Sequence, residues 1–286
     1  MPKVLANSVG LYYEERGSGP AMIWAHGLGQ NCGDWDELMA YFGDRYRVIA
    51  YDARGHGRSE LLENADAYSQ ELMVEDMAGL LDTLEIAEAI VAGHSMGANV
   101  ALNFALQRPE RCIAAIPVAI GSGSSDVARW NKYYHKLADL LDVEGTAAYL
   151  DELNSIPAWA SAMAHPRIGE RVRRSELANE PHALANVIRG VQARRPSVFD
   201  LQPRLETLSV PVLVMLSTGD EPVVECSKFL VHHLPNATLA EISARSHWTH
   251  LEAADVFHQS IDRFLEALGQ PGGSKEFKTC QNLTDA

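Results

Sequence analysis

One short segment constrains the fold of this chain more than any other: Gly93-His94-Ser95-Met96-Gly97. It directly follows the apolar run Ala89-Ile90-Val91-Ala92 and precedes a helix-like segment over residues 98–107. A serine on a very tight turn from a buried strand to a helix exposes its hydroxyl at the sheet edge, and the flanking glycines let strand and helix pack closely. The motif in this context predicts Ser95 as a nucleophile; the alternative is an incidental serine in a Gly-rich turn.

The segments around this motif alternate between strand-like and helix-like patterns. Continuous apolar runs, which are typical of strands buried on both faces, lie at residues 21–25, 46–51, 89–92, 113–118 and 210–216, and a weaker run at 237–242. Helical patterns cover residues 71–85, 98–107 and 256–268. Strands that alternate with helices in this way predict an α/β fold with a doubly wound, mostly parallel sheet.

The pattern changes after Ile120. Gly121-Ser122-Gly123-Ser124-Ser125 reads as a flexible junction, and from about Asp126 to Arg204 the chain is helical in pattern with no convincing buried strand. We therefore expect a core domain of residues 1–122 and 205–268, interrupted by a helical cap at residues 123–204. Residues 269–286 lack an apolar period and are expected to form a disordered tail.

Charge and cysteine usage exclude several classes of function. The chain has 286 residues and a formal net charge of −14, which argues against nucleic acid and anionic membranes as partners. The four cysteines form no C-x-x-C pair and no metal-ligand grouping with histidines, so we expect neither a disulfide framework nor a metal site. With no signal-peptide pattern at residues 1–5, a cytoplasmic location is the simplest expectation.

A serine hydroxyl is a weak nucleophile, so Ser95 needs a base, and the base needs an orienting acid. Asp220 directly follows the apolar run at 210–216, at the expected carboxyl end of a strand, and is the favoured acid. Glu221 is its competitor, and Asp126 is a distant third.

His247 is the favoured base among the eleven histidines. It lies in a loop before the last predicted helix, with one strand between it and Asp220, which suits neighbouring loops on one sheet edge. His250 is interpreted as a packing or capping residue. His232 and His233 are placed on a surface helix.

The tetrahedral intermediate of acyl transfer needs two backbone N–H donors for its negative oxygen. One is expected from Met96, the residue after the nucleophile. The other is expected from Leu28, because Gly27 and Gly29 on either side let the backbone turn this amide inward.

Two further groups of residues have a structural and a functional interpretation. The segment Arg54-Gly55-His56-Gly57-Arg58-Ser59 carries charges that suggest catalysis, but a tight turn with ion pairs across loops is the preferred interpretation. Large aromatic side chains could line a substrate pocket or simply pack in the core or cap. They are Trp24, Trp130, Trp159 and Trp248.

Together these motifs resemble the α/β-hydrolase superfamily from about Leu11 to Leu268. The resemblance rests on His26-Gly27, on Asp52 with residues 54–59, on residues 93–97, on Gly219-Asp220 and on Ser246-His247, in this order. It implies an eight-stranded, mostly parallel sheet flanked by helices, with a helical cap inserted after the sixth strand. Ser246 and Gly219 depart from the usual pattern, because such proteins often have Gly before the histidine and Gly-x-x-Asp at the acid.

Within the superfamily, the chain is similar to small bacterial esterases and enol-lactone hydrolases. The resemblance implies hydrolysis of a small carboxylic ester or lactone by Ser95, His247 and Asp220, with no metal or organic cofactor. A serine at the nucleophile position argues against epoxide hydrolases and dehalogenases, which have Asp there. The alternatives are a C–C bond hydrolase of aromatic ring-fission products and, from a different class, a non-catalytic ligand receptor on the same fold. The sequence leaves the oligomeric state open.

Overall fold

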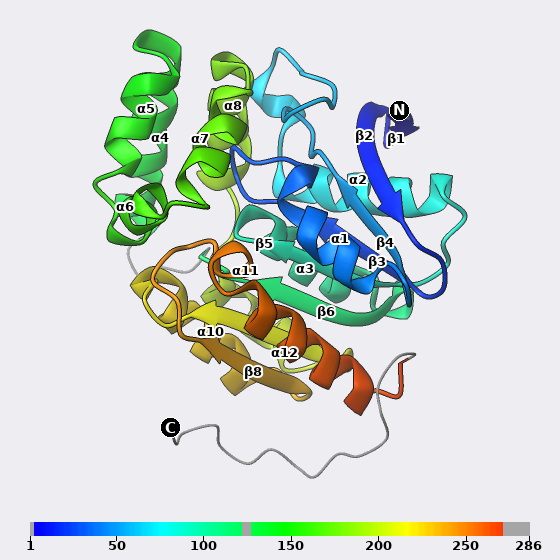
Figure 1. Cartoon of the computed structure of the whole chain (residues 1–286). Helices are drawn as coiled ribbons and strands as arrows, with labels where there is room; N and C mark the ends of the chain where they lie inside the picture. The colour runs from blue at the N-terminus through cyan, green and yellow to red at the C-terminus, as the bar shows by residue number, and fades with distance from the viewer. Residues whose placement is uncertain (1–2, 122–126, 271–286) are drawn as a thin grey trace.

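The computed structural model describes residues 3–121 and 127–270 (Figure 1). The expected flexible junction, from Ser122 onward, and the candidate acid Asp126 lie outside these residues. Residues 271–286 of the expected disordered tail lie outside them as well. Within the described residues, no helix combines the length and the apolar character that crossing a membrane requires.

Eight strands form one sheet in the order β1-β2-β4-β3-β5-β6-β7-β8. They are β1 (Lys3–Ala6), β2 (Val9–Arg16), β3 (Ala21–Ala25), β4 (Arg47–Tyr51), β5 (Ala89–His94), β6 (Cys112–Val118), β7 (Val212–Ser217) and β8 (Ala237–Ile242). The pairs β1–β2 and β2–β4 are antiparallel, and every other neighbouring pair is parallel. The predicted eight-stranded, mostly parallel sheet is confirmed.

Six of the described α-helices belong to the layers around the sheet or to its loops, and α11 among them is a single turn. They are α1 (Asp36–Phe42), α2 (Gln70–Thr83), α3 (Met96–Gln107), α10 (Glu221–His233), α11 (Thr249–Glu252) and α12 (Ala254–Ala267). Short 3-10 turns lie at Cys32–Trp35, Ala65–Ala67, Pro109–Arg111 and Val198–Leu201. Buried side chains of α1 and α12 pack on one face of the sheet, and those of α2, α3 and α10 pack on the other.

From residue 127 to residue 205, between β6 and β7, the described chain contains helices and no strand. It contains α4 (Val127–Val143), α5 (Thr146–Leu153), α6 (Pro157–Ala164), α7 (Gly169–Leu177), α8 (Pro181–Val187), a π-helical stretch (Ile188–Gln192) and α9 (Gln202–Leu205). We call α4 to α8 the cap helices. Figure 1 shows them gathered on one side of the sheet, and they have a buried apolar cluster of their own that includes Leu137, Leu150 and Val172. The exact domain boundaries at residues 122 and 205 stay a prediction.

The strand order reverses between β3 and β5, because β4 follows β3 on one side whereas β6, β7 and β8 continue on the other. In an open α/β sheet, such a point leaves a crevice outside the carboxyl ends of the strands, where ligands bind. Ser95 follows β5 directly and the glycine-containing loop after β3 begins at His26. The topology therefore brings the two predicted catalytic segments to the same crevice.

Candidate active site

The turn between β5 and α3 holds Ser95 in a strained backbone conformation. Its φ is +52° and its ψ is −105°, a region that non-glycine residues rarely adopt. Two hydrogen bonds stabilise the turn: the Ser95 amide donates to the Val118 carbonyl at 2.8 Å, and the Gly97 amide donates to the His26 carbonyl at 3.1 Å. The surrounding strands thus impose a conformation that the serine would not adopt by itself.

The two glycines of the motif allow this close approach. A Cβ on Gly97 would lie 2.2 Å from the Ala25 carbonyl oxygen, and a Cβ on Gly93 would lie 2.4 Å from the Gly97 carbonyl carbon. Both distances are far shorter than a van der Waals contact. The absence of side chains at 93 and 97 therefore lets α3 begin directly against β3 and β5.

The structure brings His247 and Asp220 together. Asp220 follows β7, is buried, and its carboxylate bonds to Nδ1 of His247 in the loop before α11. A proton shared with a carboxylate at Nδ1 leaves Nε2 as the acceptor. Ser95 and His247 line the same cavity. The competing acid Glu221 is exposed at the start of α10 and does not line this cavity.

His94 holds the loop that contains His247 in place by a hydrogen bond to its backbone. Its Nε2 donates a hydrogen bond to the His247 carbonyl oxygen at 2.9 Å, and the two rings lie 4.6 Å apart. Burial, with His247 and His250 nearby, keeps the pKa of His94 well below its ordinary value, so the ring is neutral. No local pattern reveals this role of His94, because a histidine inside a turn motif gives no sign of its partner 153 residues away.

The remaining histidine candidates lie apart from the catalytic cavity. His250 is buried against Trp35, with ring centroids 4.7 Å apart, and burial holds its pKa well below the ordinary value. His233 on α10 lies 3.0 Å from the Glu206 carboxylate, and neither His232 nor His233 lines the cavity. Their placement agrees with the packing and surface interpretations.

The loop after β3 contains Leu28, the second expected oxyanion donor. Leu28 lines the cavity, and Gly29 adopts a φ of +73°, which turns the chain directly after it. Met96 is the first residue of α3, so its amide has no partner within the helix. In the described part of the chain, no acceptor is recorded for the amide of Leu28 or of Met96. The role of these two amides as oxyanion donors stays a prediction.

Helix α7 of the cap fixes the position of this loop. The Asn179 side chain, just after α7, donates to the Gly29 carbonyl at 2.7 Å, and Gln30 donates to the Glu176 carboxylate at 2.9 Å. Glu176 is completely buried, and burial keeps its pKa well above the ordinary value, so this carboxyl group is neutral. Sequence reasoning missed these contacts, because they join segments about 150 residues apart.

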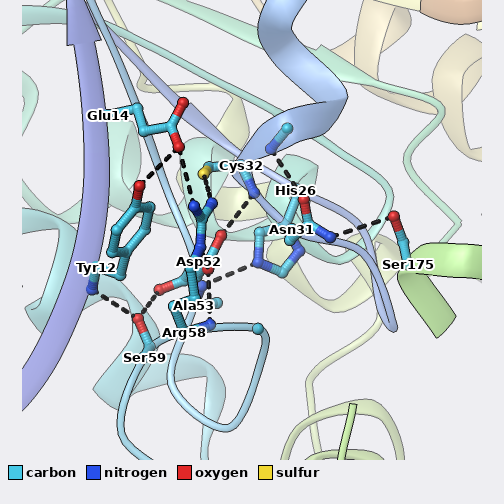
Figure 2. Close-up of polar contacts among 12 residues, drawn as sticks. Tyr12, Glu14, His26, Asn31, Cys32, Asp52, Ala53, Arg58, Ser59 and Ser175 are labelled. Carbon is cyan, nitrogen blue, oxygen red and sulfur yellow. Dashed lines mark hydrogen bonds and ion pairs between the residues drawn. The ribbon is translucent and has the colours of Figure 1, made fainter. Parts of the chain in front are cut away.

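The loop over residues 54–59 has a structural role in this arrangement. Figure 2 shows Asp52 accepting hydrogen bonds from the Cys32 amide at 2.7 Å and the Arg58 amide at 2.8 Å. Nε2 of His26 accepts from the Ala53 amide at 2.9 Å, which fixes the first ring of the loop after β3. We call residues 26–31 the oxyanion loop, after their expected role. These contacts tie the loop after β4 to the loop after β3. None of residues 54–59 lines the cavity.

The cavity has a volume of about 140 Å³ and lies between the strand ends and the cap helices. Trp130, Trp159 and Trp248 line it. Trp24 does not, and this expectation is corrected. Its side chain is completely buried between the sheet and the helices α1 and α12, with its ring centroid 4.5 Å from that of Trp35. Alternate residues of a strand point to opposite faces of the sheet, and Trp24 points to the face that these helices cover. Among the described residues, no group of His, Cys, Asp and Glu side chains is arranged to hold a metal ion.

Comparison with known proteins agrees with this geometry. The profile of a family described as "alpha/beta hydrolase fold" matches residues 20–254. The chain is 33% identical to "Putative carbamate hydrolase RutD" of Caulobacter sp. (strain K31), over 90% of this chain and 96% of that protein. It is 27% identical to "Putative 2-succinyl-6-hydroxy-2,4-cyclohexadiene-1-carboxylate synthase" of Bacillus subtilis (strain 168), over 91% and 97%.

A solved structure of similar architecture is the enol-lactonase from Burkholderia xenovorans LB400. It superposes with a TM-score of 0.81 and 26% identity, covering 93% of this chain and all of that chain (100%). The resemblance to the superfamily and to enol-lactone hydrolases, predicted from the motifs, is therefore confirmed.

Proposed function

Because the chain belongs to the α/β-hydrolase family, we propose that it hydrolyses a small carboxylic ester or lactone through an acyl-enzyme on Ser95. One observation carries the proposal. A strained serine, a histidine bonded to a buried carboxylate, and Leu28 of the loop after β3 line one small cavity, and Met96 directly follows the serine.

The first half of the reaction forms the acyl-enzyme. Nε2 of His247 takes the proton of the Ser95 hydroxyl as the serine oxygen attacks the substrate carbonyl. The carbonyl oxygen becomes negative and accepts hydrogen bonds from the amides of Leu28 and Met96. The ester bond then breaks, and the departing oxygen takes the proton from His247. With a lactone, the departing oxygen stays attached to the acyl chain.

The second half releases the acid. A water molecule gives a proton to Nε2 of His247 and attacks the acyl carbon. The new tetrahedral intermediate collapses, the bond to the Ser95 oxygen breaks, and that oxygen regains its proton from His247. Throughout, the Asp220 carboxylate holds the imidazole in the correct tautomer and stabilises its positive charge.

The comparisons support an attack on a carbonyl group but leave the substrate open. One relative is named as a carbamate hydrolase and one neighbour as an enol-lactonase, and both activities involve water and an acyl carbon. A third is named as a synthase, so the fold hosts several reactions.

Covalent labelling tests the mechanism. We expect a fluorophosphonate probe to add one group to the wild-type protein and none to Ser95→Ala, measured by intact mass. We also expect the wild type to release p-nitrophenol from p-nitrophenyl acetate and butyrate, and the variant to be inactive. A folded wild-type protein that neither reacts with the probe nor hydrolyses these esters or a panel of small lactones would refute the proposal.

A further inference from the structure

Among the residues that the structure describes, one guanidinium group lines the cavity, from the cap side, and it has no charged partner there. Arg195 follows the π-helical stretch Ile188–Gln192 and lines the cavity together with Gln192 and Tyr134 of α4. Much of the surrounding wall is apolar and aromatic, and it includes Leu137 and Trp159. A cation in such a wall is costly unless something compensates its charge.

The hydrogen bonds of Arg195 leave one end of the guanidinium free. Nη2 donates to the Tyr134 hydroxyl oxygen at 3.2 Å. Nη1 is buried, and none of the described residues accepts a hydrogen bond from it. Among the described residues, no carboxylate lies within ion-pair distance of this side chain, although Asp220 lines the same cavity and is bonded to His247.

The next residue in the chain provides the contrast. Arg194 points to the surface and pairs with Asp66 at 3.0 Å, and both of these side chains are exposed. The chain has more acidic than basic residues, 38 against 24, so a carboxylate partner for an arginine is easily supplied. Arg195 lacks one at the place where a substrate would lie.

We propose that Arg195 and Tyr134 bind a carboxylate at the far end of the substrate, so that the preferred ester or lactone carries a free acid group. Nη1 is buried in the cavity wall, and none of the described residues accepts from its two N–H donors. The Tyr134 hydroxyl accepts from Nη2 and keeps its own proton to donate. Arginine binds carboxylates with geometric specificity, because its planar fork of donors matches the two oxygens. This inference rests on the proposed function and names its substrate class.

Two esters of equal chain length test the inference. Mono-p-nitrophenyl adipate and p-nitrophenyl hexanoate differ only in a terminal carboxylate against a methyl group. We expect the wild type to have the higher kcat/KM for the adipate ester. Arg195→Met should reduce this value by ~10- to 100-fold, the usual effect of losing hydrogen bonds to a charged group, and leave the hexanoate ester nearly unchanged.

Three further variants separate charge from structure. Arg195→Lys should retain part of the preference, because it keeps the charge but loses the fork. Tyr134→Phe should lower kcat/KM for the adipate ester alone, by ~2- to 10-fold. Arg194→Met is the matched control and should leave kcat/KM unchanged for both esters. Melting curves identify any variant that fails to fold.

A binding measurement needs no turnover. Calorimetry on Ser95→Ala should give tighter binding of monomethyl adipate than of methyl hexanoate, and adding Arg195→Met should abolish the difference. If both p-nitrophenyl esters are hydrolysed with equal kcat/KM and calorimetry shows no difference, the carboxylate site is refuted and the proposed hydrolysis stands. If the folded wild type hydrolyses neither ester and does not react with fluorophosphonate, the proposed function fails, and calorimetry alone decides the binding site.

Discussion

At the scale of single residues, the choice between two adjacent acids decides the catalytic assignment. Asp220 is buried and bonded to His247, whereas Glu221 is exposed on the first turn of α10. We expect Asp220→Asn to lower kcat by ~10³- to 10⁴-fold, because the amide favours the wrong tautomer of His247. Glu221→Gln is the matched control, and its kcat for p-nitrophenyl butyrate should stay within about threefold of wild type. A large loss of kcat in Glu221→Gln and none in Asp220→Asn would identify Glu221 as the catalytic acid.

Asp34 gives a residue-scale prediction about stability and pH. Its carboxyl group is buried next to His250, neither oxygen has a hydrogen-bond partner, and burial raises its pKa from 3.8 to about 7. Between these two values the folded state binds more protons than the unfolded state, so stability falls as pH rises through this window.

We expect Asp34→Asn to remove this pH dependence. The free energy of unfolding of the variant should exceed that of wild type at pH 8, by up to about 4 kcal/mol, and by less at pH 5. Urea denaturation at both pH values measures the difference. Asp44→Asn, at an exposed position, is the control. A variant that is less stable than wild type at pH 8 would show that the Asp34 carboxylate is stabilising.

At the scale of elements, the contact between the oxyanion loop and α7 is the least expected feature. Gly29 has a φ of +73°, and a Cβ there would lie 2.0 Å from the Glu176 carboxylate. Gly145, between α4 and α5, has a similar φ of +82° with nothing within 4 Å. Alanine at Gly145 would therefore suffer backbone strain alone, whereas alanine at Gly29 would suffer the same strain and also collide with Glu176 of the cap.

We expect Gly145→Ala to cost about 1–2 kcal/mol of stability from backbone strain and to leave kcat unchanged. Gly29→Ala should cost about 1–3 kcal/mol more and lower kcat by ~10²-fold, because the Leu28 amide is displaced. Urea denaturation and p-nitrophenyl butyrate kinetics on both variants measure these effects. Equal behaviour of the two variants would mean that α7 does not position the loop.

At the scale of the whole molecule, core and cap together define the cavity. The strand ends supply Ser95 and His247, and the cap supplies Trp159 on α6, which packs against Trp248 with ring centroids 4.6 Å apart. Because neither part encloses the cavity alone, we expect the cap to set the length of the accepted acyl chain.

Replacing a large cap side chain should shift that length. Trp159→Ala enlarges the cavity, so the p-nitrophenyl ester with the highest kcat/KM should have a longer acyl chain than in wild type. The series from acetate to octanoate measures the optimum. Leu177→Ala, at an exposed position on α7, is the control and should keep the wild-type optimum. An unchanged optimum in Trp159→Ala would place the length limit in the core.

The sequence did not reveal every element of this fold by its pattern. The strands β3 to β8 coincide with apolar runs, because they are central strands or pack against helices. β1 and β2 were not identified from their pattern, since they form the antiparallel edge of the sheet and carry charged residues such as Glu14 and Glu15. Edge strands are half-solvated, so their pattern lacks the continuous apolar run.

The sequence by itself determined the parallel strands β3 to β8, the strand-to-helix turn at Ser95 and the order of the candidate residues, because these depend on local patterns and on motifs of a few residues. Only the tertiary structure decided which acid meets His247, which tryptophans reach the cavity, how α7 fixes the oxyanion loop, and that Arg195 faces the cavity unpaired. Those contacts join segments far apart in the chain, and the direction of a side chain depends on packing that no local pattern records.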